Sequence, residues 1–338
     1  MAEHKRGRQT VVFRNPPVIT HTFSIAGPKE GRGPLGGKFH RVLPDLYYGE
    51  KSWEKAEIKM LRDSIQELLA SANLSPGQTD LVLAGDLLNQ NIAASFALRE
   101  LPIPFVGLFN ACATFADALL LGAMLVDGGY VDTVVAAASS HYATAERQYR
   151  YPLELGVQRR PTAQRTVTGS GAVLLQTGGK APGPKITAAT LGIVQDMGLK
   201  DVNDMGSAMA PAAAATIEAH LSDLGRKPDY YDLIVSGDLA SVGLAITKEL
   251  LQQKQISVQN NMSCCGIMIY DLARDGVEAG GSGAGCSATV FAAHLYRELV
   301  AGNLHKLLFV GTGSLHSPTT YQQGESIPTI AHAVAVEA

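Results

Sequence analysis

A short apolar segment with the same polar borders occurs twice along the chain. The sequence TDLVLAGDLL at 79–88 returns as YDLIVSGDLA at 231–240, an offset of 231 − 79 = 152 residues. Each copy reads as an aspartate, an apolar run of strand length and a Gly-Asp turn. The same offset carries 51–72 onto 203–224, and both stretches have apolar residues at helical spacing. The predicted apolar faces are Ile58, Leu61, Ile65, Leu68 and Leu69 in the first helix, and Ile217, Leu221 and Leu224 in the second.

A second repeat begins at two cysteines. Aligning Cys112 with Cys286 matches 112–141 to 286–316. Each copy reads as an Ala-rich helix, a glycine stop and an apolar strand that ends in a polar turn. The offset is now 286 − 112 = 174 residues, so the second half carries 174 − 152 = 22 additional residues, which the sequence confines to 250–285.

Together the repeats predict a duplicated α/β fold. Strands that alternate with helices favour a mostly parallel sheet covered by helices on both faces. The helices that begin at Cys112 and Cys286 are almost uncharged in their first turns, which is typical of helices buried on all sides. We therefore expect two stacked sheets that share these helices, with one half at 1–180 and the other at 181–338.

Composition narrows the class of protein. Of 338 residues, 46% are apolar and 17% are charged, which is enough to bury a large core. The net charge is −3 and the one dense basic cluster is terminal, so we expect no nucleic-acid partner. Apolar runs stop short of the roughly 18 residues that a bilayer span requires. No basic segment followed by an apolar one opens the given sequence, so we expect no signal peptide. We expect a chain without a transmembrane segment.

The cysteines allow two interpretations. Cys112, Cys264, Cys265 and Cys286 show neither metal-ligand nor disulfide spacing, so we predict no metal site, no cofactor and a reducing compartment. Cys112 stands where a helix begins, and free N–H groups at such a position lower a thiol pKa and stabilise an oxyanion. A free cysteine is also often a small buried apolar residue. Position alone leaves both interpretations open.

Longer strings carry a resemblance to known families. NACATFADALLLGAMLVDGG (110–129) resembles the nucleophile segment of the ketoacyl synthase III type, and VTGSGAVLL (167–175) resembles the strand that follows it in that group. Further strings are similar to those of the stage V sporulation protein AD family of spore-forming bacteria. These are AGDLLNQN (84–91), SSHYATAERQYRYP (139–152), DMGSAMAPAAA (204–214), GGSGAGCSA (280–288) and ESIPTIAH (325–332).

The resemblance implies a thiolase-like, five-layered αβαβα fold. It also implies a role in the SpoVA system, which moves dipicolinic acid into the developing spore, with this chain binding that ligand with or without calcium. Other SpoVA membrane proteins are the implied partners, and the implied location is peripheral, at the inner membrane of the forespore and spore. We expect a homodimer, because thiolase-like proteins generally pair through their central sheets.

The acid–base partners of a condensing enzyme are missing at their usual places. Condensation requires a second group, usually His with an Asn or a further Cys. The thiolase resemblance implies a His in GGSGAGCSA and a Cys in VGTGSLHSP (310–318), and neither is present. Asn260 and Asn261 match the synthase III pattern only loosely, and no His occurs between His220 and His294. This pattern favours a ligand pocket over a reaction.

A ligand is expected above Cys112, at the carboxyl ends of the strands. Dipicolinate is flat and carries two carboxylates, so it requires donors, cations and apolar walls. The candidates are Ser139, Ser140, His141, Arg147, Arg150 and Asn89. Other roles stay open for all of them. The Ser-Ser-His segment could only form a turn, the arginines could pair with Glu146 or Glu154 or make a dimer contact, and Asn89 could cap a helix or lie in an interface. His316 is predicted to lie on a surface loop.

The sequence favours a non-catalytic thiolase-fold protein that binds dipicolinic acid and supports its uptake into the developing spore. Cys112 then keeps only a vestigial nucleophile position. The alternative is an acyltransferase or condensing enzyme of the ketoacyl synthase III type with Cys112 as its nucleophile. A third hypothesis, a structural subunit that docks membrane partners and has a vestigial pocket, also stays open.

Overall fold

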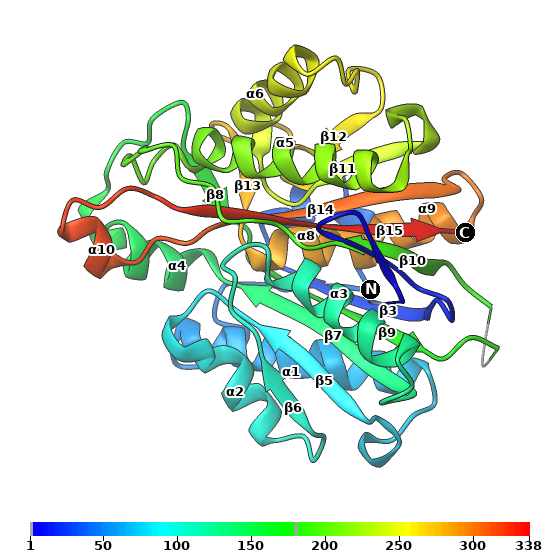
Figure 1. Ribbon diagram of the computed structural model, residues 1–338. Coiled ribbons are helices and arrows are strands. Elements are labelled where there is room, and N and C mark those ends of the chain that lie inside the picture. Colours follow the sequence, from blue (N-terminus) through cyan, green and yellow to red (C-terminus); the bar gives the residue numbers. More distant parts are fainter. Residues whose placement is uncertain (1–2, 180–181) are drawn as a thin grey trace.

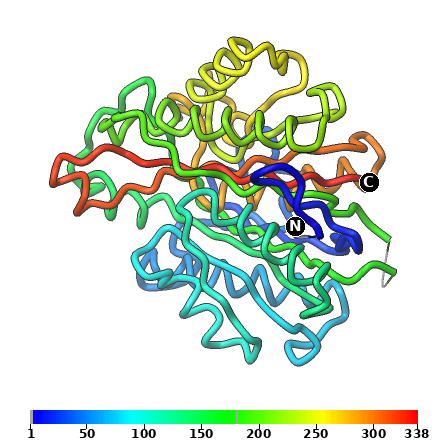
Figure 2. The backbone as a smooth tube through the Cα atoms, in the orientation of Figure 1, coloured from blue at the N-terminus to red at the C-terminus, as the bar shows by residue number. Residues whose placement is uncertain are grey.

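The chain folds into two halves with the same order of strands (Figure 1). The computed structural model describes residues 3–179 and 182–338. The expected boundary between the halves, at residues 180 and 181, lies outside the described residues. The N-terminal segment crosses from the first half to the second, where β2 (Thr10–Val12) pairs with β10 (Lys185–Thr190) (Figure 2).

The sheet of the first half has the order β3, β9, β7, β5, β6. β5 pairs in parallel with β6 and β7, whereas β9 is antiparallel to both β7 and β3. The expectation of a mostly parallel sheet is therefore corrected to a mixed one, because β9 follows β7 without a crossover helix packed on the sheet between them. The strands span Val18–Ala26 (β3), Leu81–Gly85 (β5), Phe105–Gly107 (β6), Thr133–Ser140 (β7) and Gly169–Gln176 (β9).

The sheet of the second half repeats this arrangement as β10, β15, β14, β11, β12. β11 is parallel to β12 and β14, and β15 is antiparallel to β14 and β10. One residue pair, Lys185 with Val18, connects the two sheets at their shared edge. The strands not yet bounded are β11 (Leu233–Ser236), β12 (Met262–Cys264), β14 (Lys306–Ser314) and β15 (Thr329–Glu337).

Helices form three layers around these sheets (Figure 1). α1 (Trp53–Ser71) and α2 (Ile92–Arg99) cover the outer face of the first sheet, and α5 (Met205–Leu224) and α6 (Ala240–Gln253) cover that of the second. α3 (Thr114–Asp127) packs between the sheets, against β5 and β7 on one side and β14 and β15 on the other. This confirms the five-layered αβαβα fold built from two duplicated halves.

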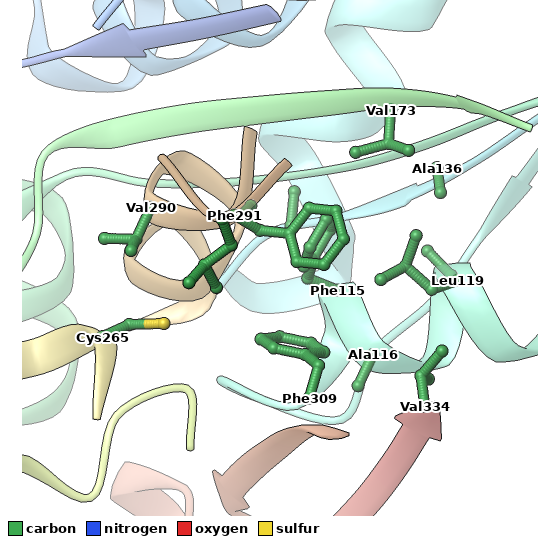
Figure 3. Close-up of a cluster of buried hydrophobic side chains, with 14 of the residues drawn as sticks. Phe115, Ala116, Leu119, Ala136, Val173, Cys265, Val290, Phe291, Phe309 and Val334 are labelled. Atoms are coloured by element: carbon green, nitrogen blue, oxygen red, sulfur yellow. The ribbon is translucent and has the colours of Figure 1, made fainter. Parts of the chain in front are cut away.

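The second central helix is made of three consecutive segments, α8 (Ala284–Val290), the π-helical η7 (Phe291–Leu295) and α9 (Tyr296–Val300). An aromatic cluster joins the central layer to the second sheet (Figure 3). The rings of Phe115, Phe291 and Phe309 lie 5.5–5.8 Å apart, edge to face, and all three side chains are fully buried. The central helices are therefore fixed against both sheets.

The first sequence repeat is confirmed as a structural repeat, and the second is confirmed as a central helix that leads into a strand, β7 or β14. The two cysteines are placed differently, because Cys112 precedes α3 by two residues whereas Cys286 lies inside α8. α1 begins at Trp53 and α5 at Met205, which reproduces the offset of 152 residues. The additional residues of the second half form α7 (Cys265–Met268) and β13 (Gly280–Ser282). β13 pairs with β8 (Gln164–Thr166) in a separate sheet of two strands. This pairing brings the insertion to the place where the two halves meet.

The remaining elements are short. They are β1 (Lys5–Arg6), β4 (Arg41–Val42), α4 (Tyr142–Tyr149), α10 (Pro318–Gln322) and the 3-10 turns η1 (Glu30–Arg32), η2 (Gly36–Lys38), η3 (Pro76–Gln78), η4 (Asn89–Asn91), η5 (Leu153–Leu155) and η6 (Pro228–Tyr230). Among the described residues, no helix is both long and apolar enough to cross a membrane.

Candidate functional site: a pocket above Cys112

A small pocket lies above Cys112, where residues of both halves meet. Its volume is about 40 Å³. The walls come from the turn after β5, the end of α4, the paired strands β8 and β13, the start of α5 and the end of β14. The lining residues are Leu87, Ala111, Cys112, Ala145, Tyr149, Arg150, Thr166, Met205, Ser282, Ser314 and His316.

A strained turn places Cys112 in this pocket. Ala111 has a φ of 50°, a left-handed conformation that is costly for a residue with a β-carbon. The turn is held by Thr114, whose hydroxyl donates to the Ala111 carbonyl at 2.7 Å and accepts from the Asn110 N–H at 3.0 Å. Cys112 therefore sits two residues before α3, at the N-terminal end of a central helix, as expected from the sequence.

The Cys112 thiol faces a buried carboxyl group, that of Asp238. Asp238 also accepts from the Thr312 hydroxyl and, at 3.3 Å, from the Gly283 N–H. Burial raises the pKa of Asp238 to about 6, against the effect of these bonds. Burial, followed by the charge of Asp238 and the bond to it, raises the pKa of Cys112 well above its usual value. At neutral pH the thiol therefore stays protonated and donates a hydrogen bond to the Asp238 carboxyl group.

Arg150 supplies the positive charge of the pocket. Its side chain is 7% exposed and pairs with Glu146. The guanidinium also donates to the carbonyls of Gln164, at 3.2 Å, and Val202, at 3.4 Å. Within the described part of the chain, Nη2 of Arg150 is buried without a hydrogen-bond partner. One charged donor is therefore available at the wall of the pocket.

His316 supplies a second polar group without a partner. Its Nδ1 lies 3.0 Å from the Ser314 hydroxyl, and its Nε2 is buried without a partner among the described residues. Burial, and secondarily the charge of Arg150, lowers the pKa of His316 to about 4, so the ring is neutral at pH 7. The expectation that His316 lies on a surface loop is corrected: it is 9% exposed and lines the pocket.

The other walls are apolar or aromatic. The rings of Tyr149 and His316 lie 5.6 Å apart, and the Tyr149 hydroxyl donates to the carbonyl of Leu87. Because its hydroxyl is held in this way, Tyr149 presents a fixed ring face to the pocket. Ala145 and Met205 complete the apolar lining. The pocket thus combines donors, one cation and apolar walls.

Of the residues singled out from the sequence as ligand contacts, Cys112 and Arg150 line the pocket. Ser139 donates to Glu57 at 3.2 Å, and Ser140 donates to the Val167 carbonyl at 2.7 Å. Successive strand residues point to opposite faces of a sheet, and each of these hydroxyls bonds to a group on its own face. Neither serine lines the pocket.

His141 caps α4 rather than lining the pocket. Its Nδ1 accepts from the Ala143 N–H at 3.2 Å, and its Nε2 lies 2.9 Å from the Leu46 carbonyl. Both ring nitrogens are therefore used inside the protein. Burial lowers the pKa of His141 to about 4, so this ring is also neutral at pH 7.

Arg147 and Asn89 lie outside the pocket. Arg147 is half-exposed, pairs with Glu54 and lies over the ring of Trp53. The backbone N–H of Asn89 donates to the Gln148 side chain at 3.2 Å. Tyr149, which lines the pocket, and Asp238, which contacts the Cys112 thiol, were not predicted, although the repeated Gly-Asp turn was a signal for Asp238.

No group of three or more His, Cys, Asp or Glu side chains in 3–179 and 182–338 is arranged to hold a metal ion. All four cysteines are buried and free. The chemistry that this pocket offers is therefore that of Arg150, His316, the hydroxyl groups and the protonated thiol.

Comparison with known proteins agrees with the strings found in the sequence. The model of the stage V sporulation protein AD family matches residues 7–337. Stage V sporulation protein AD of Bacillus subtilis (strain 168) is 47% identical over 332 residues, which cover 98% of this chain and 97% of that protein. The chain belongs to the stage V sporulation protein AD family. Its role is therefore in sporulation.

Solved structures show that this family member has the fold of condensing enzymes. A 3-oxoacyl-(acyl carrier protein) synthase III of Xanthomonas oryzae pv. oryzae superposes with a TM-score of 0.60 at 14% identity, covering 97% of this chain and 100% of that one. Cerulenin-bound OleA of Xanthomonas campestris has a TM-score of 0.58 at 14% identity, covering 97% and 98%. At this identity the likeness concerns the fold alone.

Proposed function

We propose that this chain binds dipicolinic acid in the pocket above Cys112 and supports its uptake into the developing spore, without catalysing a condensation. The observation that carries the proposal is a pair of buried side-chain nitrogens without partners, Nη2 of Arg150 and Nε2 of His316. Nε2 is a donor in the tautomer in which Nδ1 accepts from the Ser314 hydroxyl. A buried donor without a partner is costly to a protein, and a ligand carboxylate removes that cost.

The walls suit the rest of the ligand. The Tyr149 ring and the apolar side chains of Leu87, Ala145 and Met205 match a flat aromatic ring. A pocket of about 40 Å³ has room for a few water molecules and is too small for a pyridine ring with two carboxylates. Binding therefore requires the pocket to widen. Met205, at the first turn of α5, is 8% exposed and lies at its edge.

The absence of a condensing reaction rests on the surroundings of Cys112. Asp238 accepts from the thiol and, when ionised, disfavours a thiolate beside it. His316 is turned toward Ser314 through Nδ1, at 3.0 Å. A neutral imidazole whose pKa is lowered to about 4 is a weak base at neutral pH. These properties favour holding a ligand over activating a nucleophile.

The rest of the proposal concerns partners and location. We propose that the chain acts as a homodimer with other SpoVA membrane proteins, peripherally at the inner membrane of the forespore and spore. The edge strand β6 exposes Val106, and Phe109 follows it, each 48% exposed, which suits pairing with a second copy. Light scattering at micromolar concentration tests this, and a monomer would remove the dimer from the proposal.

Calorimetry of the full chain with dipicolinic acid, with and without calcium, tests the binding function. We expect saturable heat for the native chain and a much weaker interaction for Arg150→Gln and for His316→Gln. Arg99→Gln is a matched control, since Arg99 lies on α2 with its side chain 65% exposed. No saturable heat at millimolar ligand, with or without calcium, would rule the proposal out.

A second candidate, acyl transfer through Cys112, is favoured by one observation. The strained turn at Ala111, with its φ of 50°, still presents the cysteine at the start of a central helix. Intact-mass spectrometry after incubation with acyl-CoA thioesters distinguishes the two functions. An adduct on the native chain that is lost in Cys112→Ala would establish the enzyme, whereas an unmodified native chain supports the binding protein.

A further inference from the structure

A second hollow, of about 190 Å³, lies outside the Cys112 pocket between the end of α4 and α10. Six of its lining residues, Arg147, Tyr149, Arg150, Tyr151, Tyr321 and Gln322, define what we call the vestibule. We infer that the vestibule is a separate binding site for a planar aromatic carboxylate, which occupies it before entering the Cys112 pocket. This inference rests on the proposed function and assigns a second site to the same ligand.

The lining of the vestibule has the chemistry of such a ligand. Tyr151 and Tyr321 are 37% and 44% exposed, so their rings are available for stacking from solvent. Arg147, with its side chain 52% exposed, adds a guanidinium that reaches solvent. Arginine both stacks on flat rings and forms paired hydrogen bonds with carboxylates. Aromatic faces and a carboxylate-binding cation are thus present on one hollow.

The charges around the vestibule do not balance. Glu146 pairs with both Arg150 and Arg159, the latter at 3.0 Å, and Arg147 pairs with Glu54. The charged residues that line the vestibule are two arginines, Arg147 and Arg150, and the carboxylates that pair with them lie outside its lining. A nearby anion is therefore favoured, and a ligand with two carboxylates gains more from this excess than a ligand with one.

Two residues connect the vestibule to the Cys112 pocket. Tyr149 and Arg150 line both spaces. Arg150 is held at the junction by Glu146 and by the Val202 carbonyl, while its Nη2 is buried without a partner in the described chain. A carboxylate held in the vestibule therefore lies next to the donor that would receive it in the inner pocket. The volume is also consistent with this order, since the outer space is larger than the inner one.

Equilibrium dialysis of the full chain against labelled dipicolinate tests the inference. At saturation we expect two molecules bound per chain. The double variant Tyr151→Ala/Tyr321→Ala removes both exposed rings and should weaken the outer site by about tenfold, while leaving the inner one within about twofold. Arg147→Gln is a second test that leaves the rings in place and should also weaken only the outer site. Tyr130→Ala, at a 79% exposed tyrosine elsewhere, is the matched control and should bind as the native chain does.

The outcomes separate the two proposals. Two sites, one sensitive to Tyr151→Ala/Tyr321→Ala and the other to His316→Gln, support both. A single molecule bound, lost in His316→Gln and unaffected by the tyrosine or Arg147 variants, overturns the vestibule and leaves the inner site. A single molecule that depends on the tyrosines but not on His316 supports the vestibule and overturns the inner site. No binding at all overturns both.

Discussion

Asp86 and Asp238 occupy equivalent positions in the two halves of the molecule. Each follows the glycine that ends the apolar strand of the first repeat, 238 − 86 = 152 residues apart. Each is almost fully buried, and burial raises the pKa of each to about 6. The duplication therefore provides two buried carboxyl groups in the same place of the same fold.

Their neighbours differ. Asp86 accepts at 2.8 Å from the N–H groups of Leu88 and Ala94, which hold its own turn and the start of α2. Asp238 instead accepts from two side chains, the Thr312 hydroxyl and the Cys112 thiol, and from the N–H of a distant residue, Gly283. In the second half, the N–H of Ala240, which is equivalent to Leu88, donates to the sulfur of Cys264 at 3.2 Å.

The comparison shows how one half of a duplicated fold becomes a site. The carboxyl group of the first half is used for its own backbone, so it fixes local structure. In the second half the sulfur of Cys264 accepts the equivalent turn N–H, and the carboxyl group of Asp238 is left to face the Cys112 thiol. A second difference follows the same offset of 152 residues. Glu57 lies near Asp86, and the residue at the equivalent position of the second half is Met209.

Glu57 provides the largest test of this difference. Burial, and secondarily the charge of Asp86, raises the pKa of Glu57 to about 8 from 4.5. The folded chain then holds a proton that the unfolded chain loses above pH 4.5, so stability is lost as the pH rises from 4.5 through 8. Glu57→Gln replaces the titrating carboxyl group with a neutral amide and so removes this pH-dependent cost. We expect the free energy of unfolding at pH 8 to rise by on the order of 3 kcal/mol.

Urea denaturation at pH 4.5 and pH 8 measures this effect, with little change expected at the lower pH. Met209→Gln is the matched variant in the other half. It adds a buried amide without partners and should lower stability at both pH values. An unchanged pH dependence in Glu57→Gln would contradict the assignment of the proton to this pair.

Replacing each aspartate by asparagine should change the free energy of unfolding by different amounts. In Asp86→Asn the new NH₂ group faces one of two backbone N–H donors, so the free energy of unfolding should fall by about 2 kcal/mol. In Asp238→Asn the amide can donate to the Thr312 hydroxyl, which rotates to accept, so the loss should stay below about 1 kcal/mol. Thermal and urea unfolding of both variants provide the measurement. Equal losses in the free energy of unfolding would show that the two carboxyl groups have the same structural role.

The next effect concerns the ligand rather than stability. Arg150→Gln removes the charged donor from the pocket above Cys112, and we expect dipicolinate to bind about thirtyfold more weakly. Arg159→Gln is the matched control, since it pairs with the same Glu146 at 3.0 Å but does not line the Cys112 pocket. Its affinity should stay within about threefold by calorimetry. Equal losses in both variants would place the effect in the Glu146 network instead.

The sequence predicted the duplicated fold well because its signals are periodic and repeated. The apolar faces at 51–72 and 203–224 correspond to α1 and α5, and the offset between them is the same in the structure. Strand direction was less well predicted, because a strand looks the same in either direction. The parallel expectation held for β5, β6 and β7 and was wrong for β9.

The site was harder to predict because it depends on orientation and on contacts between distant segments. His141 follows a strand at the expected edge, yet its ring turns back to cap α4 through the Ala143 N–H. His316, expected on the surface, is covered by Tyr149, which is far away in the sequence. Neither outcome is encoded in a local pattern. The Gly-Asp repeat was informative, but only the structure shows that Asp238 meets Cys112.

The smallest expected effect is on the thiol itself, and it returns to the two aspartates. Asp238→Asn removes the negative charge beside Cys112, so the pKa of the thiol should fall, although burial still holds it above its usual value. Asp86→Asn changes no group in contact with Cys112 and should leave that pKa alone. The rate of Cys112 alkylation by iodoacetamide against pH, followed by peptide mass spectrometry, measures both. The same midpoint in the two variants would mean that burial alone holds the proton. A lower midpoint confined to Asp238→Asn would mean that the charge of Asp238 adds to burial in keeping the Cys112 thiol protonated.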